Sequence, residues 1–486
     1  MSQLSAVSSE THSSVNHRLE RMAYWDKYAR EEEGRGRSLA AYYHRQLIQT
    51  YQFLVAPGQR VLEVGCGVGD LLAALRPEVG VGIDFSSEMV RAAAAKHPEL
   101  RLILADSHEF DLHETFDIII LSDLLNDQWD VQKVLERVRA HATPQTRVIV
   151  NLYSRLWELP LILSAKLGLA RPTLYQNWLT AGDIQNLLAL AGFEVIRTWP
   201  EMLWPVRTPL LDVACNRFLV HLWPASHLAL TNFILARPTP VVAPRSREPV
   251  VSVLVPARNE SGNIAAIFAR TPEMGAGTEL VFVEGHSRDD TYAEIERQIA
   301  AHPERRAVLL KQPGTGKGDA VRAGFARATG EVLMILDADL TVPPEDLPRF
   351  YEALRRGTGE FINGVRLVYP MEKQAMRFFN FLANKFFSLA FSWLLGQQVK
   401  DTLCGTKVLW KSDYEKIAAG RVYFGDFDPF GDFDLLFGAA KLNLKIIDLP
   451  IRYRERLYGT TNIQRWSHGW LLLRMVGFAA RRLKFL

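Results

Sequence analysis

A proline-rich stretch in the middle of the chain, ARPTPVVAPRSREPVV (Ala236 to Val251), constrains the fold more than any other feature. It places four prolines among small and basic residues, a composition typical of a linker. On both sides of it, short apolar runs rich in β-branched residues alternate with amphipathic segments, which is the pattern of parallel α/β domains. The 486 residues suffice for two such domains, each with its own core. The sequence therefore predicts an α/β domain over residues 1–240, a linker over 241–249 and a second α/β domain over 250–486.

The strands expected from these runs share an apolar, β-branched interior. They lie in the front half at Arg60–Val64, Val79–Ile83, Arg101–Leu104, Phe116–Leu121, Arg147–Asn151, Phe193–Thr198 and Asn232–Ala236, and in the back half at Val250–Val255, Glu279–Val283, Ala307–Lys311, Val332–Leu336 and Glu360–Asn363. The motifs that carry chemistry lie at the ends of several of these strands.

Charge and cysteine content exclude some classes of protein. The net charge of +3 is too small to indicate a nucleic-acid partner. The three cysteines are far apart and odd in number, so they form no disulfide framework or metal pattern and suit a reducing cytoplasm. The polar N-terminus lacks the apolar core of a signal peptide, and no apolar run is long enough to span a bilayer. We therefore expect a cytoplasmic protein.

A glycine-rich segment, VLEVGCGVGD, joins an expected strand to an expected helix and contains Gly65, Gly67 and Gly69. Glycine permits a tight turn and lets the backbone approach a ligand without a Cβ in the way. The dinucleotide fingerprint requires G-x-G-x-x-G, and Asp70 stands here in the place of the third glycine. The NAD interpretation is therefore weakened, although the segment stays a candidate ligand-binding turn.

Two further acids follow the next two expected strands. Asp84, in VGIDFS, ends one strand beside the same crevice, where a carboxylate can accept both hydroxyls of a ribose. Asp106, in LILADSHEF, follows the strand after it and is placed to accept an adenine amino group. The alternative is structural: a tight glycine turn, with both acids serving as helix N-caps.

These motifs, in this order, resemble the class I S-adenosylmethionine-dependent methyltransferases over residues 55 to 155. The later segment Gln176 to Ile196 also resembles the end of such domains. The resemblance implies a Rossmann-like fold with S-adenosylmethionine as cofactor. Its implied binding residues are Glu63, Gly65 and Gly67 at the methionine end, Asp84 at the ribose, and Asp106 with Ser107 at the adenine.

The methyl acceptor is left open by the sequence. Methyl transfer from a sulfonium depends on alignment more than on acid–base chemistry, although an oxygen acceptor also needs a base. Asp123 ends a strand where a substrate could meet the methyl group, and it could equally cap the following helix. The sequence does not choose a base among His44, His108, His113 and Asp123. A glycan-pathway acceptor is expected.

In the back half, an apolar run from Val332 to Leu336 leads directly into Asp337 and Asp339. On a strand, residues two apart point the same way, and like charges that close raise each other's pKa unless a cation neutralises them. Magnesium and manganese prefer such oxygen ligands, and a nucleoside diphosphate supplies more of them. The pair therefore predicts a metal-bridged diphosphate site. The alternative is a solvated strand end leading into a capped helix.

Four segments around this pair, VSVLVPARNESGNI, LVFVEGHSRDDT, GTGKGDAVRAGF and ILDADL, resemble the family 2 glycosyltransferases of the GT-A fold, which use nucleotide-sugars. The resemblance implies three groups of residues. They are Pro256, Glu260, Glu284 and Asp289 in the nucleotide pocket, Lys317 near the same pocket, and Asp337 and Asp339 as the D-x-D motif for Mg²⁺ or Mn²⁺.

Within that family, DADLTVPPEDL, NGVR, MRFFN, DTLCGTKV and RYRERLYGTTN resemble the dolichyl- or polyprenyl-phosphate sugar synthases over residues 250 to 465. Thr341 stands where those enzymes have a glutamine metal ligand. The implied roles are phosphate contact for Arg366 and Arg377, an acceptor region at Asp401, Gly405 and Lys407, and a late loop with Arg456 and Gly459 that closes over the donor.

The acceptor chemistry has two alternatives. A sugar hydroxyl needs a general base, for which Asp432 and Asp434 are candidates, whereas a phosphate monoester is already ionised and needs arginines to hold it. The arginines favour a lipid phosphate. The residues expected to take part in catalysis are thus Asp339, Arg366, Arg377, Arg456 and Asp434. The alternative functions are transfer to a sugar hydroxyl, or a membrane-bound scaffold with one inactive domain.

Two segments indicate contact with a membrane surface. Lys373, Arg377, Asn380, Asn384 and Ser388 recur at helical spacing and form a polar stripe on a segment otherwise rich in Phe and Leu. Such helices lie in the bilayer interface, and the basic C-terminal segment WLLLRMVGFAARRLKFL would favour anionic headgroups. The alternative is a pair of core helices with solvated cations. We expect peripheral association with the cytoplasmic face of an anionic membrane.

Overall fold

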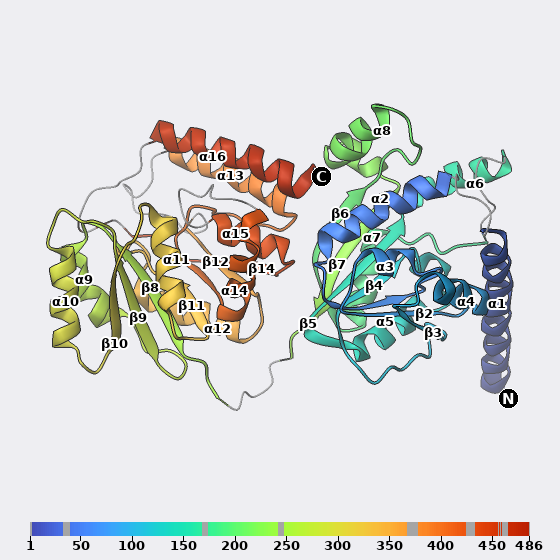
Figure 1. Cartoon of the computed structure of the whole chain (residues 1–486), viewed down its shortest axis with the longest axis horizontal. Coiled ribbons are helices and arrows are strands. Elements are labelled where there is room, and N and C mark those ends of the chain that lie inside the picture. Colours follow the sequence, from blue (N-terminus) through green and yellow to red (C-terminus); the bar gives the residue numbers. More distant parts are fainter. Residues whose placement is uncertain are drawn as a thin grey trace. The chain divides into compact units, whose positions relative to one another are not determined.

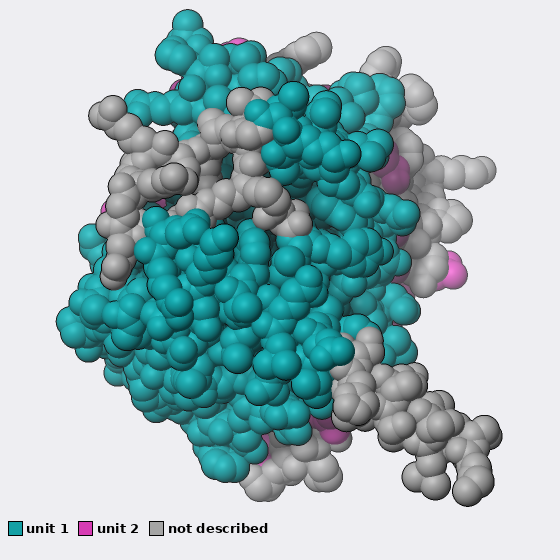
Figure 2. Space-filling model, turned by 90° about the vertical axis from the view of Figure 1, so that its right-hand side faces the viewer, with its two compact units in different colours: residues 1–239 teal, residues 240–486 magenta. Residues whose placement is uncertain are grey.

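The computed structural model describes residues 2–32, 39–167, 174–241, 247–366, 378–423, 433–454, 456, 458 and 465–485. The chain divides into two compact units, residues 1–239 and 240–486 (Figure 2). Each unit is a sheet flanked by helices (Figure 1), which confirms the two-domain α/β fold. Most of the expected linker, residues 242–246, lies outside the described residues.

Unit 1 is built on a seven-stranded sheet in the order β3-β2-β1-β4-β5-β7-β6. The strands are β3 (Arg101–Leu104), β2 (Val79–Asp84), β1 (Arg60–Val64), β4 (Phe116–Ser122), β5 (Ala142–Tyr153), β7 (Thr231–Pro238) and β6 (Phe193–Glu201). The first five are parallel, and β7 runs antiparallel to both of its neighbours. The carboxyl ends of the parallel strands therefore meet at one edge of the sheet, and the segments that follow them converge there.

The helices of unit 1 follow from amphipathic patterns in the sequence. In α5 (Val131–Ala140), the buried residues are Val131, Val134, Leu135 and Val138, a spacing that gives one apolar face. Asp130 caps this helix by accepting a hydrogen bond from the Lys133 amide. The other helices that frame the site are α1 (Ser2–Glu32), α2 (Leu39–Leu54), α3 (Asp70–Ala74), α4 (Ser87–Lys96), α6 (Glu158–Lys166), α7 (Ala181–Leu190) and α8 (Leu211–Val213).

Unit 2 has its own seven-stranded sheet in the order β10-β9-β8-β11-β13-β12-β14. The strands are β10 (Arg306–Lys311), β9 (Thr278–Glu284), β8 (Val251–Ala257), β11 (Val332–Ile335), β13 (Lys407–Trp410), β12 (Phe361–Val365) and β14 (Ile446–Pro450). The strand β13 is antiparallel to β11 and β12, while the remaining pairs are parallel. The helices are α9 (Ser261–Arg270), α10 (Thr291–Ala301), α11 (Lys317–Arg327), α12 (Leu347–Arg355), α14 (Lys411–Ala419) and α15 (Phe433–Lys441).

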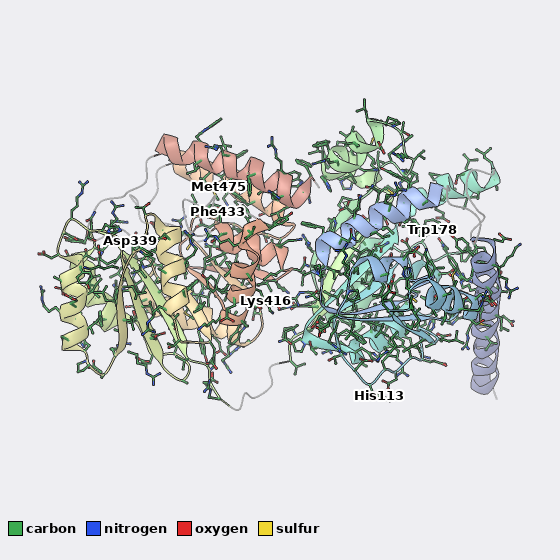
Figure 3. All side chains as sticks on the ribbon, in the orientation of Figure 1. His113, Trp178, Asp339, Lys416, Phe433 and Met475 are labelled. Atoms are coloured by element: carbon green, nitrogen blue, oxygen red, sulfur yellow. The ribbon has the colours of Figure 1, made fainter. Side chains whose placement is uncertain are left out.

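Two helices of unit 2, α13 (Phe378–Leu395) and α16 (Arg465–Ala479), lie side by side (Figure 1). Their inner faces belong to the core: Phe391 contacts Phe433 with ring centroids 5.0 Å apart, and Met475 is fully buried close by (Figure 3). Their outer faces expose large apolar side chains, including Leu389 at 72% and Trp470 at 66%. Each helix therefore buries one face in the core of unit 2 and exposes large apolar side chains on the other.

The polar stripe expected on α13 is partly wrong. Ser388 is buried and donates a hydrogen bond to the Val399 carbonyl over 2.9 Å, so it satisfies a core carbonyl and does not face solvent. Lys373 and Arg377 lie outside the described residues. Within the described part of the chain, no helix is long and apolar enough to cross a membrane. The three cysteines, Cys66, Cys215 and Cys404, are buried.

Candidate active sites

The glycine-rich turn lies between β1 and α3. Gly65, Gly67 and Gly69 all have positive φ, at 74°, 51° and 79°, a region that other residues rarely adopt. The Gly65 amide donates to the Ile83 carbonyl over 2.8 Å, which ties the turn to β2. A Cβ on Gly65 would lie 2.7 Å from Cδ1 of Leu124, so the segment after β4 packs directly on the turn. A Cβ on Gly67, by contrast, would meet nothing within 4 Å, so the turn is packed against the segment after β4 at Gly65 and has open space at Gly67.

Asp84 lies at the end of β2, where the sequence places it. Its Oδ2 accepts a hydrogen bond from the Gly67 amide over 2.9 Å, and its Oδ1 accepts one from the Ser86 amide over 2.9 Å. Burial raises the pKa of Asp84, although these two amides favour its charged form. The carboxylate is thus fixed against the glycine turn, in reach of the same ligand.

Glu63 points into the interior beneath the turn and is only 3% exposed. Among the described residues, its Oε2 has no hydrogen-bond partner. Burial raises the pKa of Glu63 to about 8, with smaller contributions from Asp84 and Asp70. A buried carboxylate with an unused oxygen fits a ligand that brings a positive charge, such as an amino group beside a sulfonium.

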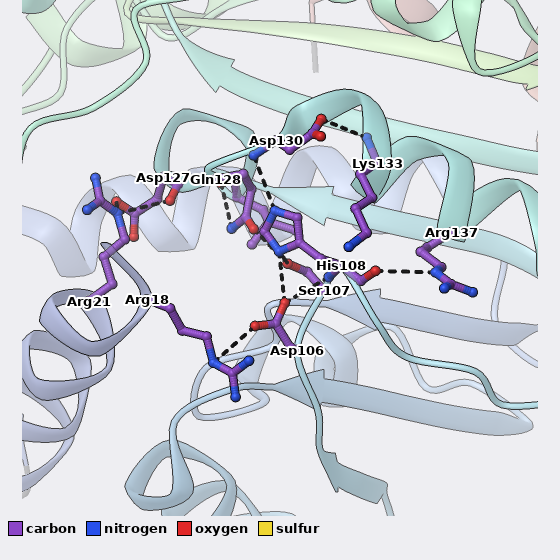
Figure 4. A network of polar contacts seen from close by, with 11 residues as sticks. Arg18, Arg21, Asp106, Ser107, His108, Asp127, Gln128, Asp130, Lys133 and Arg137 are labelled. Carbon is purple, nitrogen blue, oxygen red and sulfur yellow. Dashed lines mark hydrogen bonds and ion pairs between the residues drawn. The ribbon is translucent and has the colours of Figure 1, made fainter. Parts of the chain in front are cut away.

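Asp106 and Ser107 follow β3 and belong to a polar network (Figure 4). Asp106 accepts hydrogen bonds from the His108 amide and ring, both over 2.8 Å, and lies 3.3 Å from the Arg18 guanidinium. Ser107 donates to Gln128 over 2.6 Å. Burial opposes ionisation of Asp106, but the His108 contacts hold its pKa below the usual value. Both residues are therefore at the expected edge, and an adenine amino group would compete with His108 and Arg18.

The sequence does not predict the helix α1, which brings several residues to this edge. Arg21 donates to the Asp127 carboxylate over 2.8 Å, and the Trp25 indole donates to the same carboxylate over 3.0 Å. Asp26 accepts from the Ser86 hydroxyl at the end of β2. The spacing of Arg18, Arg21 and Trp25, at i, i+3 and i+7, is the signal that could have indicated a helix with one contacting face.

In unit 2, three acids follow β8 and β9. The Glu260 carboxylate is buried and accepts from Asn263 over 2.7 Å and from Arg456 over 2.9 Å. Glu284, also buried, accepts from the Ser287 amide, and Asp289 accepts from the Ser261 amide over 3.3 Å. Burial raises the pKa of Glu260 to about 7, against the influence of Arg456. These contacts join the ends of the two strands into one polar rim.

Asp337 follows β11 and pairs with Lys317 at the start of α11, with Nζ 2.7 Å from Oδ1. Burial opposes ionisation, but the Lys317 ammonium holds the pKa of Asp337 below its usual value. A Cβ on Gly405 would lie 2.1 Å from Asp337 Oδ2 and 2.4 Å from Lys317 Nζ. Any larger residue at position 405 would therefore clash with the ion pair between Asp337 and Lys317.

Asp339 makes a separate ion pair. Its Oδ2 accepts from the Arg456 guanidinium over 2.7 Å, and its Oδ1 accepts from the Thr341 hydroxyl over 2.7 Å (Asp339 is labelled in Figure 3). The strand itself ends at Ile335, and the Leu340 amide donates back to the Asp337 carbonyl, forming a turn. The two aspartates therefore stand on a turn and take different cationic partners, whereas the sequence suggests side chains that share one face of a strand.

Arg366 and Asp401 form a bidentate pair over 2.7 and 2.8 Å, with Asp401 buried at 1% exposure. Both lie at the carboxyl end of β12, and Arg366 is also held over the Tyr453 ring. Lys407 is fully buried and donates to the Cys404 carbonyl. The residues expected around the acceptor are thus brought together, with Asp401 as the internal partner of Arg366.

Asp434 is in a different setting. Its carboxylate lies 4.0 Å from Arg322 and 3.8 Å from Arg421, on the helical side formed by α11, α14 and α15. Its role as a base stays a prediction. Pro256 occupies β8 beside the polar rim. The remaining expected residues, Arg377, Asp432 and Gly459, lie outside the described residues.

The residues expected to bind a divalent metal ion are the two aspartates, Asp337 and Asp339. Within the described ranges, no group of three or more His, Cys, Asp or Glu side chains is arranged to hold a metal. Magnesium, however, is commonly bound through one or two carboxylates together with water and substrate phosphates. Asp337 and Asp339 supply two such carboxylates, at the strand end where a diphosphate would bring the remaining oxygens. The donor set therefore fits a metal that arrives with the nucleotide.

The sequence matches two families, one in each unit. The family described as methyltransferase domain matches residues 39–198, and the family described as glycosyl transferase family 2 matches residues 252–417. The chain carries a methyltransferase domain followed by a family 2 glycosyltransferase domain. Both resemblances predicted from the motifs are confirmed, and the protein is an enzyme with two transferase domains.

Several curated relatives match the chain. The dolichol-phosphate mannosyltransferase of Pyrococcus furiosus is 27% identical over 246 residues, which are 48% of this chain and 67% of that protein. The undecaprenyl-phosphate 4-deoxy-4-formamido-L-arabinose transferase of Pectobacterium carotovorum is 28% identical over 217 residues, 43% of this chain and 62% of that protein. The dolichol-phosphate mannosyltransferase of Saccharomyces cerevisiae is 36% identical over 108 residues, 21% and 40% respectively. The chain thus spans about two fifths to two thirds of these relatives.

Solved structures also resemble parts of the chain. The magnesium protoporphyrin IX methyltransferase of Synechocystis shows 18% identity and a TM-score of 0.31, over 48% of this chain and 99% of that one. The glucosyl-3-phosphoglycerate synthase of Mycobacterium tuberculosis shows 19% identity and a TM-score of 0.35, over 49% and 80%. Because both TM-scores are low, the two domain assignments depend on the family matches.

Proposed function

We propose that the glycosyltransferase domain transfers a sugar from a nucleotide-sugar to a polyprenyl phosphate, and that the methyltransferase domain methylates an acceptor of the same glycan pathway. One observation carries the first part. Two aspartates at the end of β11 are each neutralised by a cation from a distant segment, Lys317 for Asp337 and Arg456 for Asp339. A site with this composition suits a ligand that brings both negative charge and a metal ion.

The binding of the donor is assigned to the polar rim. Pro256, Glu260, Glu284 and Asp289 would contact the nucleoside, and Lys317 and Arg456 would hold the diphosphate. Asp337 and Asp339 would hold Mg²⁺ or Mn²⁺. A bound divalent ion supplies neutralisation of the negative charge that develops on the departing diphosphate.

A polyprenyl phosphate is favoured over a sugar hydroxyl as acceptor. A phosphate monoester is ionised near neutral pH and attacks without a general base, so it needs only cations for positioning. Arg366, Arg377 and Lys407 are the candidate cations, and the names of the relatives include dolichol phosphate and undecaprenyl phosphate. Transfer to a hydroxyl, with Asp434 as base, is the second candidate. This second candidate is based on the Asp434 carboxylate, which lies beside Arg322 and Arg421.

The methyltransferase domain is assigned S-adenosylmethionine as its methyl donor. Glu63, Gly65 and Gly67 would hold the methionine end, Asp84 the ribose, and Asp106 with Ser107 the adenine. The unused buried oxygen of Glu63 supports this assignment, because the methionine amino group and the sulfonium are both positive.

Contact with an anionic membrane surface is part of the proposal for the glycosyltransferase domain. The outer faces of α13 and α16 expose Phe386, Leu389, Trp470 and Leu473, and Arg481 and Arg482 are exposed at the C-terminal end. Apolar side chains beside basic ones favour a negatively charged interface. Co-sedimentation with anionic liposomes at low salt, lost in Arg481→Glu with Arg482→Glu, is the expected result. Failure of the parent protein to co-sediment would remove this part of the proposal.

A panel of nucleotide-sugars tests donor and acceptor together. The protein would be incubated with each donor and either a polyprenyl phosphate or a soluble glycan, with and without manganese. We expect a glycosylated polyprenyl phosphate that forms only with the metal, identified by product mass. A glycosylated glycan instead would support the hydroxyl acceptor, and metal-independent transfer would contradict the role of the two aspartates.

A further inference from the structure

Asp123, directly after β4, has a backbone conformation that side chains rarely adopt. Its φ is 51°, in the left-handed region, where a residue other than glycine is strained unless its surroundings hold it there. The next residue, Leu124, packs on Gly65 in the cofactor turn. Strained residues beside ligand sites often position a reacting group. Asp123 therefore stands at the edge where the methyl group of a bound cofactor would emerge.

Neutral hydrogen-bond donors surround the Asp123 carboxylate. Its Oδ1 accepts from the Asn151 amide over 2.6 Å and from the Tyr43 hydroxyl over 3.0 Å. Asn151 is itself oriented by Tyr51, which donates to its Oδ1 over 2.6 Å. The Tyr153 hydroxyl also hydrogen-bonds to Asp123, and its ring is stacked with that of Tyr43 at a centroid distance of 5.5 Å. The acid is thus oriented by several groups without being paired to a cation by any of them.

This environment makes Asp123 a proton acceptor near neutral pH. Burial raises the pKa of Asp123 to about 7, against the hydrogen bonds from Tyr43, Tyr153 and Asn151. The titratable groups that face it are Tyr43 and Tyr51 from α2 and Tyr153 from β5. Burial raises the pKa of each of these phenols well above 10, so they stay neutral where Asp123 titrates.

The three histidines that the sequence leaves as alternatives are placed differently. His108 is engaged by Asp106 on one ring nitrogen and by the Asp130 amide on the other. His113 precedes β4, at the opposite edge of the sheet, and its side chain is 87% exposed (Figure 3). His44 lies on the exposed side of α2. Asp123 is the member of this set that is both buried in a network and beside the cofactor turn.

A cavity of about 680 Å³ opens at the same edge of the sheet. It is lined by Ser154 and Asn232, the chain neighbours of Tyr153 and Thr231, and by the apolar side chains of Leu156, Leu159 and Leu179. The charged or titratable side chains of Arg155, Glu158 and His227 also line it. Thr231 is in turn 3.3 Å from the Tyr43 hydroxyl. The cavity therefore begins one residue beyond the network around Asp123, and its mixed lining suits an acceptor with both hydroxyls and an apolar part.

We propose that Asp123 is the general base of the methyltransferase domain and that the acceptor is a hydroxyl group. The inference rests on the proposed use of S-adenosylmethionine. An Asp123 oxygen takes the hydroxyl proton while the acceptor oxygen attacks the methyl carbon. The carbon–sulfur bond breaks, and its electron pair stays on sulfur. The products are a methyl ether, S-adenosylhomocysteine and a protonated Asp123. An acceptor carboxylate would need no base.

The test uses the full chain, labelled S-adenosylmethionine and two probes, octyl glucoside and octyl glucuronide. Both offer hydroxyls and an apolar tail, and the second adds a carboxylate that would give a methyl ester. We expect the label in an alkali-stable ether. Asp123→Asn should lower kcat about a hundredfold, a typical general-base contribution. It should leave the S-adenosylmethionine Kd within about twofold, because asparagine tolerates the left-handed conformation. Asp117→Asn, at the exposed opposite end of β4, is the matched control.

A pH profile separates a catalytic role from a structural one. At saturating S-adenosylmethionine, kcat of the parent protein should rise with pH through an inflection near 7, and Asp123→Asn should lack that inflection. An alkali-labile ester, no transfer to either probe, or an unchanged kcat in Asp123→Asn would each overturn the inference. Failure of the parent protein to bind S-adenosylmethionine would instead overturn the proposed cofactor, so the two failures are distinguishable.

Discussion

The two domains surround their acids in opposite ways. In the methyltransferase domain, Glu63, Asp84 and Asp123 are held by neutral donors, and burial raises the pKa of each. Asp106 differs, because contacts with His108 and Arg18 hold its pKa below the usual value. In the glycosyltransferase domain, Asp337 and Asp401 face Lys317 and Arg366, which hold the pKa of each carboxylate below its usual value. Glu260 and Asp448 differ there, because burial raises the pKa of each carboxylate.

The difference matches the charge of the proposed ligands. A sulfonium cofactor with an amino group is positive, and a site whose carboxylates have no cationic partner gains most from binding it. A nucleoside diphosphate is negative. In a site that already holds a lysine and an arginine, these side chains can leave their carboxylate partners and pair with the diphosphate instead. The partners of most buried carboxylates thus differ between the two sites in the direction that the charges of the proposed ligands favour, and four variants can break or sharpen this comparison.

The largest effect is expected for Asp339→Ala. This change removes one of the two carboxylates assigned to the metal and leaves Arg456 without its 2.7 Å partner. We expect sugar transfer to fall by about a thousandfold or more, as when a group that stabilises transition-state charge is lost. S-Adenosylmethionine binding, measured by calorimetry, should be unchanged. An equal loss in both assays would contradict two independent sites.

Asp84→Ala should act only on the front domain. It removes a carboxylate that organises the Gly67 and Ser86 amides and that is assigned to the ribose. Loss of charge-assisted hydrogen bonds should weaken S-adenosylmethionine binding by about ten- to a hundredfold. Asp111→Ala, at an exposed position on the β3–β4 connection, is the control. Unchanged affinity in Asp84→Ala would remove the ribose assignment.

Glu63→Gln tests the buried acid through pH. The pKa of Glu63 is about 8 in the folded protein and 4.5 when exposed. Between these values the unfolded chain releases a proton that the folded protein keeps, so stability falls as the pH rises from 4.5 to 8. Glutamine mimics the protonated acid and avoids this loss. In the absence of ligand, the variant should be close to the parent near pH 4.5 and exceed it by about 4 kcal/mol at pH 8.

Denaturant unfolding of the full chain measures this difference, and the front-domain transition is identified by its stabilisation with S-adenosylmethionine. The cofactor should reduce the advantage of Glu63→Gln at pH 8, because its positive charge favours the ionised glutamate. An advantage that is constant across the pH range would contradict the burial of an unpartnered acid.

The smallest effect is expected for Gly405→Ala. The added methyl group would meet both Asp337 and Lys317 and force their ion pair apart. We expect the apparent KM for the donor to rise about tenfold, in line with a displaced but retained contact. Gly477→Ala is the control, because a Cβ there meets nothing within 4 Å. A donor KM equal to that of the control would show that the ion pair does not contribute to the site.

The sequence predicts most strands well, at the centre and at the edges of the two sheets, and misses two short strands of unit 2. The bounds of the central strand β1 and of the edge strand β3 agree with the expected strands, since both are mainly apolar runs closely followed by glycine or aspartate. The strands β13 and β14 are absent from the prediction. Each is only four or five residues long, and Lys407 and Asp448 interrupt their apolar character. These strands are stabilised by pairing with strands that are distant in the sequence, and the local pattern of apolar residues does not reveal such pairing.

For the two sites, too, local sequence signals predict the position of a residue but not its partners. Motif positions place Asp84, Asp106, Asp337 and Asp339 at the correct strand ends, because strand order fixes where a loop emerges. Their partners come from elsewhere in the chain, such as Arg18 from a polar helix that shows no strong apolar stripe. Partner identity depends on tertiary packing, so neither the charge balance of the two sites nor the network around Asp123 could be predicted from sequence.

In the glycosyltransferase domain, Arg456 would couple the proposed binding of the metal ion to that of the nucleoside diphosphate. Its guanidinium is shared between Asp339 and Glu260, at 2.7 and 2.9 Å. An isolated divalent cation would have to expel it towards solvent, whereas a cation that comes with a diphosphate offers it a new anionic partner. If the metal and the diphosphate bind as proposed, each would thereby increase the affinity for the other, and a metal ion without its nucleotide would bind only weakly.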